Sequence, residues 1–242
     1  MSTSLYSRNE VFALLHLFWN STSADDEKRR ICADEKFLKS VTYNDVKHHR
    51  IWTYFDENSQ RTLLNREICK IHVYMARYTS HPEILRELFH KIYIALVFGR
   101  NSAKRYVGCY FEIAAEIAAN YHTPCDILIE LYKRADSDYS VTARITLQLK
   151  EAWENFCASF TEEERVIWEK LESKIPLRDE PVNIDVFNLS QLSPVEKRML
   201  VYYPPEQCRS ILYHHYSECP EIVREALREI AKIEHCENYL KN

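Results

Sequence analysis

Three short segments of the chain decide its fold class: residues 82–88 read PEILREL, residues 126–131, which follow Pro124, read DILIEL, and residues 220–227 read PEIVREAL. Each places a proline at or just before the start of a helix, then an acidic residue, then leucine or isoleucine in pairs. Recurrence of one such unit at a spacing of tens of residues is typical of helical arrays, whose units bury their apolar stripes against neighbouring units. The segments therefore predict an all-α protein built of stacked antiparallel helix pairs.

Composition supports this prediction. The chain has 242 residues, of which 46% are hydrophobic and 28% charged, which is typical of a folded domain rather than a disordered chain. It contains only two glycines. Tight hairpin turns and phosphate-binding loops both need residues that tolerate positive φ. The low glycine content therefore argues against an antiparallel β architecture and against nucleotide-binding loops of the Rossmann or P-loop kind.

Helix-start signals recur along the chain. A serine or threonine three residues before a glutamate predicts a capping box, in which the hydroxyl and the carboxylate each satisfy a free backbone N–H. This signature occurs in Ser7 with Glu10, Thr161 with Glu164, and Ser193 with Glu196. Thr123 before Pro124 predicts a further N-cap. We expect helices over residues 8–19, 24–40, 43–56, 60–78, 82–98, 102–120, 124–135, 139–159, 162–173, 194–202, 205–216 and 220–239.

Residues 118–145 (AANYHTPCDILIELYKRADSDYSVTARI) resemble one unit of the leucine-rich repeat variant family, which is HEAT-like in style. The matching positions are Ala119, Asn120, Thr123, Pro124, Ile127, Leu128, Leu131, Asp136, Asp138, Val141 and Arg144. Residues 75–88 and 202–212 look like weaker copies. The resemblance implies an α-solenoid-like superhelix (HEAT/LRV-like), or a compact helical relative, with Ile127, Leu128 and Leu131 in the core. Because the clustered cysteines that hold an iron–sulfur cluster in one such protein have no counterpart here, no cofactor is carried over.

One stretch interrupts the helical pattern. Residues 175–191 contain Pro176, Pro181, Asn183 and Asn188, which break any regular periodicity. We expect a long loop or linker there, between a helical array over residues 1–174 and C-terminal helical repeats over residues 192–242 that pack on the same array. The alternative is that residues 182–189 add a short strand or pack as an extended arm, but a strand would lack an obvious partner.

The eight cysteines are far apart in sequence, and no two are separated by the two residues typical of zinc or redox sites. We therefore expect reduced thiols packed as small apolar groups, as in a cytosol. The apolar run at residues 11–19 is too short to cross a bilayer and lacks a signal-peptide cleavage site. These features predict a cytoplasmic protein without membrane partners.

Metal and catalytic motifs are weak. The histidine pairs His48/His49 and His214/His215 point about 100° apart on a helix, so neither pair chelates a metal well alone. His235 beside Cys236 gives no thiol–base pair, because neighbouring helical side chains diverge. We therefore expect no catalytic residues, no bound metal and no cofactor.

A basic middle segment gives a nucleic-acid alternative. Residues 66–150 carry a net charge of +3, and their basic residues are interspersed with tyrosines. In a nucleic-acid complex the basic side chains would bind phosphates and the tyrosine rings would stack on bases. Some HEAT-like enzymes excise alkylated DNA bases in this manner, so a base-excising enzyme is included in this alternative. The candidate contacts are Arg100, Lys104, Arg105, Lys133 and Arg134.

The C-terminal part favours a protein partner. Residues 151–242 carry a net charge of −7, which attracts a basic protein surface and disfavours nucleic acid. Tyrosines beside acidic residues suit a protein-binding face, because a tyrosine supplies a large contact area and loses little side-chain entropy on binding. The candidate binding residues are Tyr202, Tyr203, Glu206, Tyr213, Tyr216 and Glu218. We expect a non-enzymatic helical-repeat protein that acts as an adaptor, an inhibitor or immunity-type neutraliser, or an effector.

Overall fold

Every regular element that the structure describes is helical. The computed structural model describes residues 5–19, 25–48, 51–66, 68–98, 109–134, 137–173, 175, 191–204 and 206–241. In these residues every regular element is an α-helix or a short 3-10 helix, and none is a β-strand. This confirms the all-α prediction. The chain divides into two compact units, Met1–Ile127 (unit 1) and Leu128–Asn242 (unit 2).

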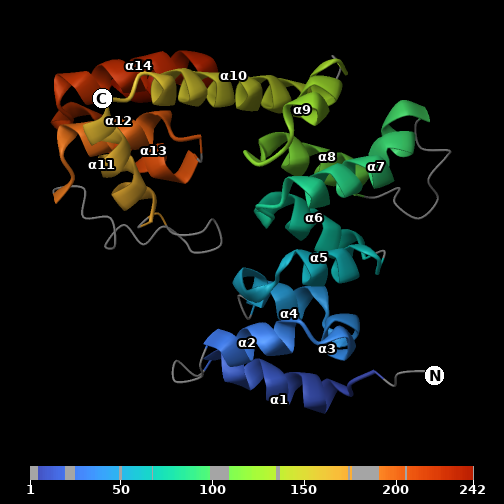
Figure 1. Cartoon of the computed structure of the whole chain (residues 1–242). Coiled ribbons are helices and arrows are strands. Elements are labelled where there is room, and N and C mark those ends of the chain that lie inside the picture. Colours follow the sequence, from blue (N-terminus) through green and yellow to red (C-terminus); the bar gives the residue numbers. More distant parts are fainter. Residues whose placement is uncertain are drawn as a thin grey trace. The chain divides into compact units, whose positions relative to one another are not determined.

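Unit 1 contains eight consecutive α-helices and one 3-10 helix in the described residues, and Figure 1 shows them succeeding one another from α1 (blue) to α8 (green). They are α1 (Arg8–Trp19), α2 (Asp25–Cys32), α3 (Glu35–Ser40), α4 (Tyr43–His48), η1 (Ile51–Tyr54), α5 (Glu57–Leu64), α6 (Cys69–Tyr78), α7 (Pro82–Phe98) and α8 (Tyr110–Ala119). Helix α9 (Cys125–Tyr132) spans the boundary between the units. Several helices pack on the helix two places further along the chain: α3 packs on α5, α5 on α7, and α6 on α8.

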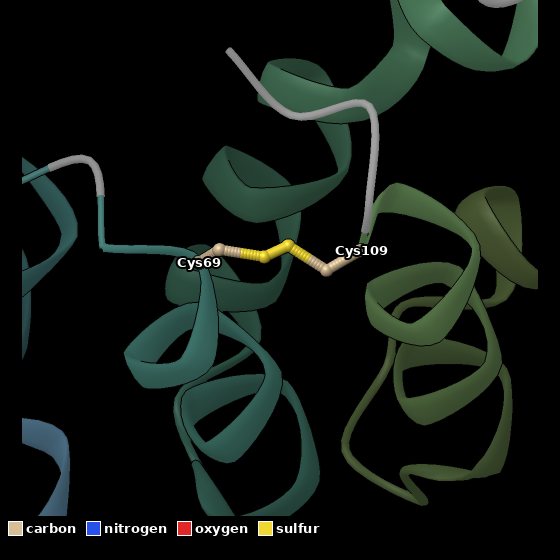
Figure 2. Close-up of a disulfide and its surroundings, with 2 residues drawn as sticks. All are labelled: Cys69 and Cys109. Atoms are coloured by element: carbon tan, nitrogen blue, oxygen red, sulfur yellow. A yellow bond between two sulfur atoms is a disulfide. The ribbon is translucent and has the colours of Figure 1, made fainter.

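Helices α6 and α8 lie side by side and run in the same direction. At one end, Cys69 at the start of α6 faces Cys109, the N-cap residue of α8 (Figure 2). At the other end, the Asn120 side-chain amide, which is fully buried, donates to the carbonyls of Ala76 at 2.8 Å and Thr79 at 3.0 Å. Helix α7, which connects them in sequence, also packs on α8.

Cys69 and Cys109 form a disulfide, which corrects the expectation that the cysteines are reduced thiols. Their Cα atoms are 6.3 Å apart, within the range that a disulfide spans. The two residues are 40 positions apart in sequence, so no local spacing motif predicts that they pair. Cys32, Cys125, Cys157, Cys219 and Cys236 are free thiols.

Unit 2 is also helical. Its elements are α10 (Asp138–Ala158), α11 (Glu162–Glu172), α12 (Pro194–Tyr202), α13 (Glu206–His214), η3 (Tyr216–Glu218), α14 (Glu221–Glu234) and η4 (Glu237–Lys241). Helix α12 packs along α14, and α10 contacts both of them. Helix α14 buries one side, through Val223, Leu227 and Ile230, and exposes charged residues on the other, as the three-to-four spacing of its apolar residues predicts.

An aromatic cluster joins α10, α11 and α12 inside unit 2. The Trp153 ring on α10 lies 4.6 Å from the Trp168 ring on α11 and 5.4 Å from the Tyr203 ring, measured between ring centroids. The Phe156 ring stacks on the Tyr202 ring with centroids 4.3 Å apart and planes 19° from parallel. This aromatic cluster holds α10, α11 and the end of α12 together, and so fixes which sides of α10 and α11 are exposed.

The sequence predicts helix positions well and misses several breaks. The predicted bounds 8–19, 82–98 and 194–202 are those of α1, α7 and α12. The single helix predicted over residues 24–40 is wrong, because Asp34 accepts a hydrogen bond from the Lys36 N–H at 2.8 Å and starts a new helix. The helix predicted over residues 60–78 is likewise two helices, α5 and α6, which are separated at residues 65–68.

The long loop predicted over residues 175–191, the alternative strand over residues 182–189 and the start of the helix predicted over residues 102–120 fall mainly on residues outside the described part of the chain. None of the helices described is both long enough and apolar enough to span a membrane.

Candidate functional site

The predicted tyrosine patch divides between the core and the surface of unit 2. Tyr202 is 9% exposed, and its hydroxyl donates a hydrogen bond to Glu229 on α14. Burial, together with this hydrogen bond, raises the pKa of Tyr202 to about 12. Tyr203 packs against both Trp153 and Trp168. Both rings therefore hold unit 2 together, and Tyr202 offers little area to a partner.

Tyr213 belongs to a buried polar cluster around Glu234, the last residue of α14. Its hydroxyl donates to Glu234 Oε2 at 3.1 Å, and burial together with the Glu234 charge raises the pKa of the phenol. Arg209, only 1% exposed, donates through Nε to Glu234 Oε1 at 2.8 Å. Arg209 Nη1 also donates to the carbonyls of Tyr203 and Pro204, each at 2.8 Å. The cluster therefore fixes α13, α14 and the end of α12 to one another.

Two further members of the patch, Tyr216 and Glu218, lie at the surface. The Tyr216 hydroxyl accepts a hydrogen bond from Arg228 Nε at 2.8 Å, and Arg228 also pairs with Glu221 at 3.0 Å. The Glu218 side chain is 76% exposed and lies 3.4 Å from His215 Nδ1. The side chain of Glu206 falls outside the described residues. Among the predicted residues whose side chains are described, Tyr216 and Glu218 are thus the ones placed where a partner has direct access.

The predicted nucleic-acid contacts are only partly described. Arg100, Lys104 and Arg105 fall within residues 99–108, outside the described part of the chain. Lys133 is exposed and pairs with Glu130 at 2.9 Å, and Arg134 is half-buried after the end of α9. No basic groove is therefore assembled from the residues in hand.

The predicted weakness of the His235–Cys236 motif has a structural reason. His235 ends α14 in the left-handed region at φ 55°, and its Nε2 atom lies 3.1 Å from Arg144 Nη2. The Cys236 sulfur instead lies 3.7 Å from Glu234 Oε2, and burial raises the pKa of its thiol. A raised pKa keeps this cysteine protonated, which is the opposite of an activated nucleophile. Among the described residues, no three His, Cys, Asp or Glu side chains are grouped to hold a metal ion.

An acidic surface whose residues the sequence did not single out lies on α10 and α11. On α10, Glu151 and Glu154 are exposed, one turn apart, and on α11, Glu169 and Glu172 are likewise exposed and one turn apart. The charges of Glu172 and Glu154 both act on the half-buried Cys157 thiol, whose pKa rises to about 11, mainly because of burial and then because of these two carboxylates. Glu154 on α10 and Glu172 on α11 therefore both lie near the Cys157 thiol. We call these four residues the acidic face (α10 and α11 in Figure 1).

The four carboxylates of the acidic face form no ion pairs with lysine, arginine or histidine within the described part of the chain. In unit 1, by comparison, four acidic side chains are paired: Glu35 with Lys39, Glu57 with Arg61, Glu116 with Arg77, and Asp126 with Arg86. The net charge of −7 over residues 151–242 was the sequence signal for this surface.

Comparison of the chain with family models, with curated proteins and with solved structures gives no match.

Proposed function

We propose that this protein is a non-enzymatic helical-repeat protein that binds another protein, and that the partner presents a basic surface to the acidic face of unit 2. The proposal depends chiefly on one observation: the four exposed carboxylates of the acidic face have no basic partner within the described chain. Unneutralised charge of one sign steers a partner of the opposite sign and sets its orientation.

The geometry of unit 1 supports the repeat part of the proposal. Three contacts join residues at nearly the same separation: Cys69 with Cys109 at 40 residues, Arg77 with Glu116 at 39, and Arg86 with Asp126 at 40. They place α8 beside α6 in parallel, and the start of α9 beside α7. A constant offset of about 40 residues between equivalent helices is the period of HEAT-like repeats. We infer that α6–α7 and α8–α9 are successive helix pairs.

The acidic face is supported by a packed core, which favours binding. Glu151 and Glu154 stand on the outward side of α10, whose inward residues Trp153 and Phe156 lie in the aromatic cluster. Carboxylates fixed on a packed scaffold lose less freedom on binding than carboxylates on a loop, so more of the electrostatic attraction appears as affinity.

Comparative affinity capture tests this function. Three baits are compared: the wild-type chain, a face variant with Glu151→Gln, Glu154→Gln, Glu169→Gln and Glu172→Gln, and a control variant with Glu27→Gln, Glu112→Gln, Glu225→Gln and Glu237→Gln. All of the substituted residues are exposed, and both variants lose the same net charge. We expect the wild-type and control baits to enrich the same basic protein, and the face variant to lose it.

Two outcomes contradict the proposal. Equal capture by the face variant and the wild type would remove the acidic face as the binding site. The second is capture of nucleic acid that stays bound through washing and whose binding weakens steeply as the salt concentration rises. That result would favour the nucleic-acid alternative, because phosphate binding releases counterions.

A further inference from the structure

Beyond this function, we propose that the Cys69–Cys109 disulfide is a reversible redox switch, which a cellular dithiol or glutathione opens to loosen one end of the α6–α8 pair. The two sulfurs meet at the starts of two parallel helices, as Figure 2 shows.

Both helix starts favour thiolates. Helices α6 and α8 are each ten residues long, and neither has a side-chain hydrogen bond at its N-cap. Free N–H groups and the helix dipole at an N-terminus stabilise a negative charge and lower the pKa of a thiol placed there. The first turn of α6 contains no acidic residue, and Lys70 stands next to Cys69. Because the dithiolate form gains stabilisation that the disulfide lacks, reduction is easier than for a purely structural bond.

The two sulfurs differ in access, which gives the reaction a direction. Cys69 is half-buried, whereas Cys109 is 7% exposed. An incoming thiolate therefore attacks the sulfur of Cys69, forms a mixed disulfide there, and releases Cys109 as a thiolate at the start of α8. A second thiol of the reductant then displaces Cys69. In total, two electrons and two protons pass to the cysteine pair, and the reductant leaves as its own disulfide.

Opening the bond acts locally, because other contacts hold the far ends of the two helices. Arg77 Nε donates to Glu116 Oε2 at 2.9 Å, and the buried Asn120 amide bridges the end of α8 to the carbonyls that end α6. The disulfide closes a 40-residue segment that contains α7. Reduction thus frees the starts of α6 and α8 while their last turns stay packed.

The test equilibrates the full-length protein in glutathione buffers from fully oxidised to fully reduced, followed by alkylation and peptide mapping. Hydrogen exchange is measured on the two end states. We expect the Cys69–Cys109 link to open and re-form across the glutathione range, with faster exchange in the first turns of α6 and α8 and unchanged exchange in their last turns. Absence of the link in the oxidised protein, a link that persists in the most reducing buffer, or identical exchange in both states would each overturn the proposal.

Two charge variants test the electrostatic cause without removing a cysteine. Glu112 lies in the first turn of α8, where its negative charge opposes a thiolate. Glu112→Gln should shift the equilibrium with glutathione toward the reduced form by about twofold to fivefold, and Lys70→Gln should shift it the other way. Cys125→Ser, which removes an exposed free thiol, should leave the equilibrium unchanged and exclude disulfide scrambling as the cause. Shifts of the same sign in both charge variants would overturn the helix-terminus explanation.

Discussion

At the residue scale, buried charges in both units are stabilised by paired partners. The Asp45 side chain is 4% exposed and accepts hydrogen bonds from Arg8 at 2.7 Å and from the Thr42 N–H at 2.7 Å. Burial raises the pKa of Asp45, but the hydrogen bonds from Arg8 and Thr42 outweigh it, so the pKa is lowered overall. Asp45 therefore fixes the start of α1 to the start of α4 as a charged group.

The lowered pKa of Asp45 predicts a pH-dependent contribution to stability. A carboxyl with a depressed folded-state pKa stabilises the native state fully above its unfolded value of about 3.9, and loses that contribution as pH falls through the folded value. Asp45→Asn should lower the free energy of unfolding by about 1–3 kcal/mol at pH 7, with a smaller difference from wild type at pH 3. Urea titrations at the two pH values measure this, with the exposed Asp26→Asn as control. An equal loss at both pH values would contradict the charged role of Asp45.

The Arg209–Glu234 pair gives a second prediction. Removing one partner of a buried ion pair leaves an uncompensated charge and costs about 3–5 kcal/mol, whereas replacing both removes most of that cost. Arg209→Met should therefore destabilise unit 2 strongly, and adding Glu234→Gln to it should recover part of the loss. Chemical denaturation of the single and double variants, followed by tryptophan fluorescence, measures both. A double variant less stable than Arg209→Met alone would show that the pair itself, rather than the stranded carboxylate, dominates.

At the element scale, α9 shows which part of the repeat pattern is structural. Leu128 and Leu131 are fully buried, as the sequence predicts, while Ile129 between them is 42% exposed. Leu128→Ala should cost about 2–5 kcal/mol, and Ile129→Ala should cost less than about 1 kcal/mol because it leaves no cavity. Equilibrium unfolding of the two variants measures the contrast. Similar losses for both would mean that the faces of α9 are assigned wrongly.

Helix starts were predictable because capping is local chemistry. In all three predicted capping boxes the glutamate N–H and the Ser or Thr hydroxyl are paired as expected, for example Glu164 N with Thr161 Oγ1 at 3.2 Å. Thr123 is different: its hydroxyl donates to the Ile117 carbonyl at 2.6 Å and so serves the end of α8, although the sequence predicted a cap for the next helix. The breaks at residues 33–34 and 65–68 were missed because apolar residues continue through them at helical spacing.

At the scale of the whole molecule, the fold class was predictable, and the location of the candidate surface only in part. Low glycine content and the repeated helix starts give an all-α chain without any tertiary information. The burial of Tyr202 depends on Phe156, 46 positions earlier in the sequence, so composition near Tyr202 carried no signal of it. The charge of residues 151–242 indicated an acidic surface, but only packing shows that Trp153 faces inward and that Glu151 and Glu154 face outward.

The most direct test of the proposed function is the dissociation constant of the captured partner for the three baits as a function of salt. If the acidic face binds a basic protein, the face variant should bind at least about tenfold more weakly than wild type at low salt, and the gap should narrow as salt rises. The control variant, with the same net charge, should bind like wild type. Face and control variants that weaken binding equally, at every salt concentration, would contradict a binding site on α10 and α11.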